Sequence, residues 1–192
     1  MKKASKILLF SMILALAIPV ANLNAQLFDE GDIVLSAGIG LGATYYSGIG
    51  NKTTIPPVWI AGDYCLREAL GPGNLGVGGY IGYSAYKWHY TYFDYDYGTK
   101  YGNLIIAGRG TYHFVDLVDK LDLYGGVLLG FRIVSHKDFG DWQLDYDYNY
   151  NASSVAYSLF AGARYFLSDN FGVMAELGYG IAYLSLGASL KL

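Results

Sequence analysis

Apolar residues alternate with small or polar residues along most of this chain, and this period-two pattern constrains the fold more than any other feature. The segment 33–45 shows it best. Its odd positions are all apolar, from Ile33 to Tyr45, whereas its even positions after Val34 are glycine, serine or threonine. Successive side chains of a β-strand point to opposite faces. The segment therefore predicts a long strand with one apolar face and one small or polar face.

The same segment contains a glycine pattern that is typical of nucleotide-binding loops. Gly38, Gly40 and Ala43 fit the dinucleotide fingerprint, and Asp63 follows at about the expected spacing of 20 residues. That fingerprint requires a helix to begin at its last small residue, so that the helix N-terminus faces the phosphates. The segment 44–57 instead holds two glycines, a β-branched run and a proline pair, which disfavour a helix. We therefore reject the nucleotide interpretation.

The first 25 residues have the layout of a secretory signal peptide. Three lysines precede an apolar run at 7–20, and a polar patch ends at Ala25. The run is short for a membrane-spanning helix, so we expect cleavage after Ala25, with an uncleaved N-terminal anchor as the alternative. The remaining residues, 26–192, have the length of one domain.

The composition narrows the possible classes of protein. Cys65 is the only cysteine, which excludes an internal disulfide and a cysteine zinc site. The formal net charge of −3 gives no indication of a nucleic-acid partner. No continuous apolar segment of about 18 residues follows the signal, so no membrane helix is expected. We also expect no cofactor and no metal ligand set.

The alternation recurs in eight segments with turn-forming residues between them. The predicted strands cover, in chain order, about 33–45, 57–67, 77–86, 102–114, 123–133, 155–167, 171–179 and 184–192. In each segment, the alternate positions that are not apolar hold mostly glycine and serine with isolated charges. The water-facing side of a soluble sheet is usually rich in lysine, glutamate and threonine instead. The narrow interior of a small closed barrel has room for such residues. The fold prediction is all-β, an eight-stranded antiparallel up-and-down barrel.

The apolar faces indicate that this barrel spans a membrane. Each has the length of a tilted transmembrane β-strand, which takes about 9–11 residues, and aromatic residues gather near both strand ends. Short connections are predicted at 68–74, 115–119 and 168–170, and they alternate with connections at 46–55, 88–101, 136–153 and near Gly180. Outer-membrane barrels have short periplasmic turns and longer external loops, which predicts a location in a bacterial outer membrane.

Five charged residues fall at the alternate strand positions that are predicted to face the barrel lumen. They are Asp63, Arg109, Arg132, Arg164 and Glu176. All except Arg132 lie at a similar distance from a periplasmic turn, and so at a similar depth in the barrel. We interpret the set as a buried ion network that plugs the lumen, because an unpaired buried charge is costly. An ion path or gate is the alternative.

Two predicted external loops, 87–101 and 136–151, alternate tyrosine with aspartate. This pattern predicts hairpins that extend above the membrane as paired ribbons. Tyrosine-rich surfaces suit recognition, so an adhesin-like contact surface is one interpretation and a stiff rim without a ligand is the other. The candidate contact residues are Trp88, Tyr92, Tyr95, Tyr97, Trp142, Tyr146 and Tyr148.

A weak calcium site between the loops is a further possibility, with Asp94, Asp96, Asp145 and Asp147 as its ligands.

Histidines and serines near the external loops raise the question of catalysis. An outer-leaflet lipid-modifying enzyme needs a histidine, a serine and an acid close together. The candidates are His89 and His136 with Ser84, Ser135 and Ser153. No spacing singles them out, and we interpret both histidines as solvated loop residues. The prediction is a protein that is not an enzyme.

The exported precursor, the eight alternating strands and the ending "NFGVMAELGYGIAYLSLGASLKL" resemble the small eight-stranded outer-membrane barrels. The resemblance is to the OmpA transmembrane domain and OmpX type, and more closely to the outer-membrane β-barrel proteins of Bacteroidetes-like bacteria. It covers the whole mature chain, although Leu192 replaces the usual terminal aromatic residue. It implies a monomer that contacts outer-membrane lipid, lipopolysaccharide and the barrel-assembly machinery. A structural or surface-interaction role is predicted, with a narrow ion or small-solute channel and a lipid-modifying enzyme as alternatives.

Overall fold

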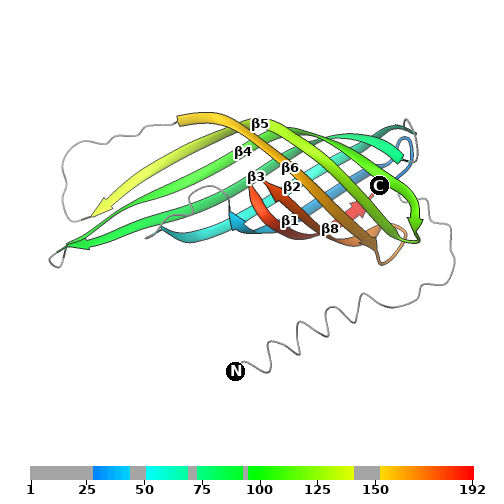
Figure 1. The fold of residues 1–192 in the computed structure, drawn as a ribbon. Helices are drawn as coiled ribbons and strands as arrows, with labels where there is room; N and C mark the ends of the chain where they lie inside the picture. Colours follow the sequence, from blue (N-terminus) through cyan, green and yellow to red (C-terminus); the bar gives the residue numbers. More distant parts are fainter. Residues whose placement is uncertain (1–27, 44–50, 69–72, 93–94, 141–151) are drawn as a thin grey trace, which may run out of the picture.

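The computed structural model is a closed barrel of eight antiparallel strands, in which each strand pairs with its neighbours in chain order and β8 returns to β1 (Figure 1). The structure describes residues 28–43, 51–68, 73–92, 95–140 and 152–192. The predicted fold class is confirmed, and the predicted signal peptide, 1–25, lies outside these residues. In the part of the chain that the structure describes, no helix has the length and hydropathy needed to cross a membrane.

The strands agree with the eight predicted segments in number and order, but β2 to β5 are longer than predicted. They are β1 Ile33–Ala43, β2 Asn51–Glu68, β3 Gly73–Tyr92, β4 Tyr95–Val118, β5 Leu121–Gly140, β6 Ala152–Phe166, β7 Phe171–Tyr179 and β8 Ala182–Lys191. We call the end with the turns after β4 and β6 the short-turn end, and the opposite end the extended end.

The two faces of each strand differ as the alternation predicts. On β5, the side chains of Val127 and Leu129 are 59% and 66% exposed on the outside, whereas Leu128 between them is 4% exposed. The outer face carries most of the exposed large apolar residues, and the inner face carries the buried serine, threonine and charged residues. An apolar surface that surrounds a closed barrel is what a lipid environment requires.

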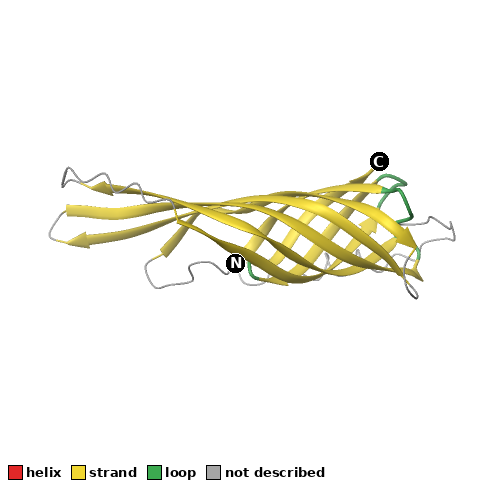
Figure 2. Ribbon diagram, turned by 90° about the horizontal axis from the view of Figure 1, so that it is seen from above, coloured by secondary structure: helices red, strands yellow, loops and turns green. Residues whose placement is uncertain are grey.

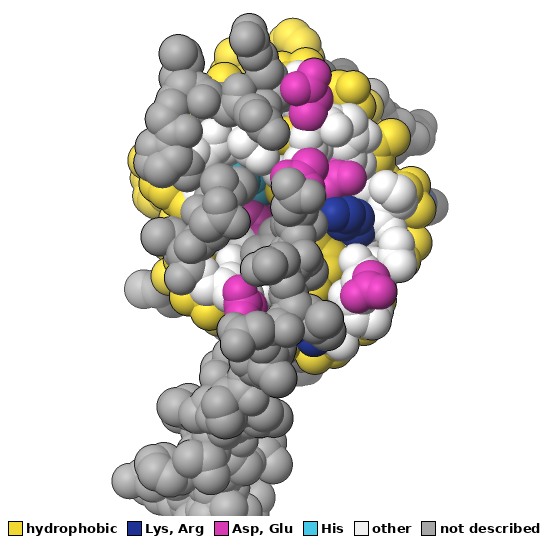
Figure 3. Space-filling view, turned by 90° about the vertical axis from the view of Figure 1, so that its right-hand side faces the viewer, with side chains coloured by type: hydrophobic (Ala, Val, Ile, Leu, Met, Phe, Trp, Pro, Cys, Tyr) yellow, Lys and Arg dark blue, Asp and Glu magenta, His cyan; other side chains and the backbone are white. Residues whose placement is uncertain are grey.

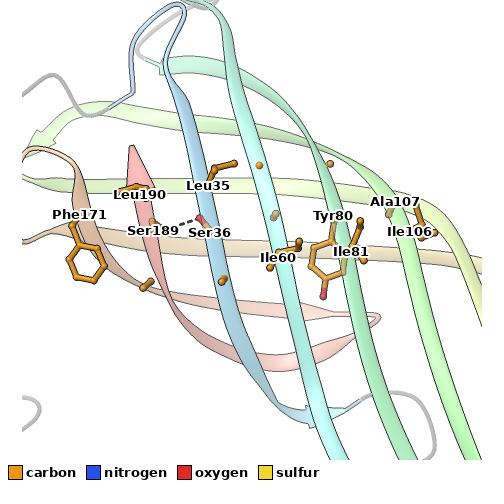
Figure 4. A pocket seen from close by; sticks show the side chains of 15 residues that line it. Leu35, Ser36, Ile60, Tyr80, Ile81, Ile106, Ala107, Phe171, Ser189 and Leu190 are labelled. Carbon is orange, nitrogen blue, oxygen red and sulfur yellow. Dashed lines mark hydrogen bonds between the residues drawn. The ribbon is translucent and has the colours of Figure 1, made fainter. Parts of the chain in front are cut away.

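The outer face also carries an apolar groove of about 660 Å³, shown in Figure 4. Small residues such as Gly62 and Gly79 lie there among larger apolar side chains. The larger residues are Leu35, Ile60, Ile81, Ile106, Phe171 and Leu190. These large side chains project from the outer face, away from the charged residues of the lumen.

Three strands project beyond the rest of the barrel at the extended end (Figures 1 and 2). The pairing of β3 with β4 continues to Tyr92 opposite Tyr95, and the pairing of β4 with β5 continues to Tyr97 opposite Gly140. We call residues 88–92, 95–100 and 135–140 the extension. The predicted pairing within the first ribbon is confirmed for the described residues 87–92 and 95–101. For the second loop the structure shows strand only as far as Gly140, and 141–151 lie outside the described residues.

The predicted turn at 115–119 is wrong. Strand β4 continues to Val118, which pairs with Leu121, and the turn consists of Asp119 and Lys120. The pairing changes register between Phe114 and Val118, so this end of β4 contains a bulge that a strict period-two reading does not anticipate. Lys120 adopts a left-handed φ of 61°, which closes the short turn.

The predicted connection at 46–55 is also partly wrong, because β2 begins at Asn51. Register shifts occur between Thr53 and Ile55 and between Ile55 and Val58. The two prolines at 56 and 57 lie within this stretch, and proline cannot donate a ladder hydrogen bond. The prolines therefore disturb the pairing locally without ending the strand.

Candidate functional site in the barrel lumen

An ion cluster from four strands fills the lumen near the short-turn end. Arg109 on β4 lies between two carboxylates: its Nε is 3.0 Å from Oδ1 of Asp63, and its Nη2 is 3.3 Å from Oε2 of Glu176. The first pair is close without the alignment of a hydrogen bond, so its attraction is coulombic. Arg164 on β6 approaches Asp63 from the other side, with Nη2 and Oδ2 3.5 Å apart.

Aromatic rings cover the two guanidinium groups of this cluster. The Arg109 guanidinium lies 4.5 Å from the ring centre of Phe160, and that of Arg164 lies 5.0 Å from the ring centre of Tyr124. The Tyr124 hydroxyl also donates to Oε2 of Glu176 over 3.1 Å. Cation–π contact and hydrogen bonding together offset the desolvation of these charges.

A third acidic residue and a histidine extend the cluster towards the short-turn end. Arg164 Nη1 is 2.8 Å from Oδ2 of Asp122, and Oδ1 of Asp122 is 2.7 Å from Nδ1 of His113. The His113 Nε2 lies 2.9 Å from the Thr111 hydroxyl. Two guanidinium groups face three carboxylates here, and the His113 imidazole lies against one of these carboxylates.

Sequence reasoning missed Asp122 and His113. The predicted strand began at 123, which left Asp122 in a turn, although counting back by two from Tyr124 places it on the lumen face. His113 falls on the same parity as Arg109 and was not assigned a role. Both side chains are buried in the structure.

Hydroxyl groups join the cluster across the seam between β1 and β8. The Ser36 and Ser189 hydroxyls are 2.8 Å apart (Figure 4), and Arg164 Nε donates to Ser189 over 3.0 Å. The last strand pair of the closed barrel is therefore tied to the charges of the lumen.

Phe28, which precedes the first strand, caps the lumen at the short-turn end. Its side chain is fully buried, and its ring stacks on His113 with centroids 3.9 Å apart. Its carbonyl accepts a 2.6 Å hydrogen bond from Nδ2 of Asn74 and contacts the Cys65 thiol at 3.8 Å. Figure 3 views this end, where acidic and basic side chains lie across the mouth within a hydrophobic circumference.

An apolar layer fills the lumen on the other side of the ion cluster. Its members are Trp59, Ala61, Tyr80, Ile105, Tyr124, Leu128, Ala156, Phe160, Met174 and Ile181. A cavity between this layer and Glu176 has a volume of about 20 Å³, the size needed for a single water molecule. The ion cluster is thus enclosed between Phe28 and the apolar layer.

Four of the five charged lumen residues named from the sequence meet in this cluster. The structure places Arg132 elsewhere: its Nε donates to the Ser154 hydroxyl over 3.0 Å, nearer the extended end. Parity defines the face of a strand but not the depth, so the assignment of Arg132 to the same network stays a prediction.

The candidate contact residues are only partly within the described chain. Trp88 is 39% exposed near the base of the extension. Tyr92, Tyr95 and Tyr97 are placed by strand register alone. Three further candidates, Trp142, Tyr146 and Tyr148, lie outside the described residues, as do the calcium candidates Asp94, Asp145 and Asp147. Asp96 is placed by register, opposite Thr91. Within the described ranges, no group of three or more histidine, cysteine or acidic residues could hold a metal ion.

The residues considered for lipid chemistry lie on both faces of the barrel wall. Ser84 and His136 have the parity of the lumen face, and His89, Ser135 and Ser153 have that of the outer face. Ser84 is buried on the lumen face, whereas Ser135 is exposed on the outer face. The His136 ring packs near Tyr101, with centroids 6.4 Å apart.

Solved structures with a similar fold are outer-membrane barrels. The chain is similar to the N-terminal β-barrel domain of OprF from Pseudomonas aeruginosa, with 14% identity, a TM-score of 0.51, and coverage of 85% of this chain and 98% of that one. The fold is that of the small outer-membrane β-barrels.

Two further structures match over similar shares of the chain. They are the attachment invasion locus protein Ail of Yersinia pestis, with 16% identity, a TM-score of 0.47 and coverage of 85% and 99%, and OprG of Pseudomonas aeruginosa, with 12% identity, a TM-score of 0.46 and coverage of 86% and 97%. No protein-family model and no curated protein sequence matches the chain.

Proposed function

We propose that this protein is an integral barrel of a bacterial outer membrane, with a closed lumen, whose extension contacts partners at the cell surface. In this orientation the short-turn end faces the periplasm, because outer-membrane barrels have short periplasmic turns and long external segments. The ion cluster in the lumen then stabilises the folded barrel, and the extension contacts partners outside the cell.

The observation that carries the proposal is the extension itself. Three strands continue in register past the end of the other pairings, and the β3–β4 hairpin ends at Tyr92 opposite Tyr95. A barrel needs none of this length to cross a bilayer, since about 9–11 residues per strand suffice. Tyrosine offers flat contact area with a polar tip at low entropic cost, which suits a recognition surface.

The filled lumen favours this role over conduction. Phe28, the ion cluster and the apolar layer lie in series along the axis. An eight-stranded barrel has an interior just wide enough for its own side chains.

The test compares the wild-type protein with a Tyr92→Ser, Tyr95→Ser, Tyr97→Ser variant in intact cells. Treatment of the cells with a protease that cannot cross the outer membrane shows which segments are external. Electrophoresis of unboiled and boiled membranes then tests the barrel, and the mobility of the protected core is expected to shift on boiling for both proteins. Attachment of the cells to arrays of immobilised glycans and extracellular-matrix proteins is expected to fall in the variant only. Equal attachment by both proteins contradicts the contact role, and a soluble product without a mobility shift contradicts the barrel.

A further inference from the structure

The hairpin of β3 and β4 has its aromatic positions on one face at the extended end. On β3 the even positions belong to the lumen side, since Tyr80, Ser84 and Tyr86 are all buried. Residues directly opposite each other in an antiparallel pair share a face, so the odd positions of β4 belong to the same side. We call these positions, from 84 to 92 and from 95 to 103, the inner face of the hairpin. Beyond Tyr86, its aromatic positions are Trp88, Tyr90, Tyr92, Tyr95, Tyr97 and Tyr101.

The charged residues of the same stretch fall at the opposite positions. Lys87, Asp96 and Lys100 all have the parity of the outer face. Within 84–92 and 95–103, no lysine, arginine, aspartate or glutamate falls at an inner position. On the neighbouring strand β5, the exposed Asp138 has inner parity, and its carboxylate accepts a 2.6 Å hydrogen bond from the Thr99 hydroxyl. The inner face of the hairpin is therefore aromatic and uncharged, which favours a neutral ligand over a polyanion.

This face opens to the outside at Trp88. Along the inner positions of β3, Tyr86 is 3% exposed and Trp88 is 39% exposed. On β4 the change comes between Asn103, which is fully buried, and Tyr101, which is half-buried. The strands then continue beyond the rest of the barrel (Figure 2). A ligand at the cell surface can therefore approach the inner face from the extended end.

A buried amide without a partner lies just below this opening. The Asn103 side chain is 0% exposed, and neither its Nδ2 nor its Oδ1 has a hydrogen-bond partner in the part of the chain that the structure describes. Asn103 is two residues from Tyr101, a distance of about 7 Å along a strand. Buried polar groups in folded proteins nearly always have partners, because an unpaired one is costly. The exception at Asn103 indicates a partner from outside the chain.

The amide also defines the chemistry of that partner. Nδ2 donates and Oδ1 accepts, so the partner must both accept and donate. A carboxylate, sulfate or phosphate only accepts, and an ammonium group only donates, whereas adjacent sugar hydroxyls do both. A flat aromatic ring such as that of Trp88 offers apolar area on which the C–H face of a sugar ring can pack.

We propose that the inner face of the hairpin binds a neutral oligosaccharide, with a sugar ring packed on Trp88 and hydroxyl groups on the Asn103 amide. Because Asn103 is buried, a hydroxyl reaches it only when the side chains above it shift, and the unmet bonds of the amide favour that shift. This inference rests on the proposed function and deepens it, since it names the class of surface ligand.

The experiment uses the full mature protein in phosphatidylcholine nanodiscs. Maltohexaose, cellohexaose and chitohexaose are the neutral probes, a heparin hexasaccharide is the anionic comparison, and calorimetric titration measures each affinity. At least one neutral probe is expected to bind. Trp88→Ala and Asn103→Leu are each expected to lower its affinity about tenfold, the loss of one stacking contact or one amide contact. His89→Ala removes a ring from the next position, on the outer face, and is expected to retain the affinity.

Asn103→Leu also separates ligand binding from a structural role. The substitution replaces an unpaired amide with an apolar group of similar size, so the midpoint of denaturant unfolding is expected to rise while the affinity falls. A lower midpoint with unchanged affinity shows that the amide serves the fold, and this overturns the inference.

The remaining outcomes separate this inference from the proposed function. A wild-type protein that does not insert as a heat-modifiable barrel overturns both. A heat-modifiable barrel that binds none of the neutral hexasaccharides, or only the heparin hexasaccharide, overturns this inference alone. Should Asn103→Leu fail to fold, equal affinity of Trp88→Ala and the wild type has the same consequence.

Discussion

The ring of Phe28 stacks on the imidazole of His113 at a centroid distance of 3.9 Å, although the two residues lie at distant positions in the chain. Phe28 belongs to the segment before the first strand, and His113 lies near the end of β4. The contact joins the N-terminal segment to the ion cluster, because His113 is also 2.7 Å from Asp122. The closure of the short-turn end therefore depends on a residue outside the barrel wall.

Replacing Phe28 by alanine is expected to open this end. The buried Cys65 thiol lies against the Phe28 carbonyl and packs in the same small cluster, so it becomes accessible when the ring is removed. Reaction of the folded protein with a maleimide is expected to be much faster in Phe28→Ala than in the wild type or Phe28→Leu, with Cys65→Ser as the blank. Stability is expected to fall by about 3 kcal/mol. An unreactive thiol in Phe28→Ala shows that another group closes the mouth.

Arg109→Met is expected to destabilise the barrel strongly. The substitution leaves Asp63 and Glu176 without the cation between them, and losing one partner of a buried ion pair costs about 3–5 kcal/mol. Reversible denaturant unfolding in lipid vesicles measures the change. Adding Asp63→Asn and Glu176→Gln to Arg109→Met is expected to recover part of the loss. A single variant as stable as the wild type contradicts a structural role for the cluster.

Two adjacent glycines on β3 provide a matched pair. A Cβ at Gly78 meets the Gly62 carbonyl oxygen and lies 2.7 Å from Oδ1 of Asp63, whereas a Cβ at Gly79 meets nothing within 4 Å. Gly78→Ala is expected to cost about 1–3 kcal/mol through crowding. Gly79→Ala is expected to stabilise the barrel by about 0.4–1 kcal/mol, because alanine restricts the unfolded chain. Equal effects in the same unfolding assay indicate that the lumen at this depth is not tightly packed.

The wild-type protein is expected to show no steady conductance in a planar bilayer. The apolar layer with Trp59 and Leu128 lies in series with the ion cluster, and the cavity between them is about 20 Å³. Arg109→Ala and Glu176→Ala are the diagnostic variants. Steady wild-type openings that either substitution abolishes or alters favour the channel alternative.

The period-two pattern was sufficient to predict the barrel, because the alternation of faces is a local property of every strand. It placed Asp63, Arg109, Arg164 and Glu176 on the inner face, where the structure brings them together. It failed near residue 115, where a bulge shifts the register and β4 continues past the predicted turn. Asp122 was missed because the predicted strand began one residue later, at 123.

Parity also cannot reveal contacts that depend on depth or on segments without periodicity. Arg132 has the inner parity but bonds to Ser154, because its position along β5 is nearer the extended end. Phe28 precedes the alternating pattern, so no periodic signal marks it as a cap.

The sequence by itself determined which side chains face lipid and which face the lumen, since the two-residue period of a strand needs no information from its neighbours. Only the tertiary structure decided which of those side chains meet. Lys52, Lys87, Lys100 and Lys137 have no regular spacing in the chain, and each becomes the neighbour of the next because strand register sets the pairing. Register depends on turns, bulges and barrel closure together, and these are properties of the whole fold.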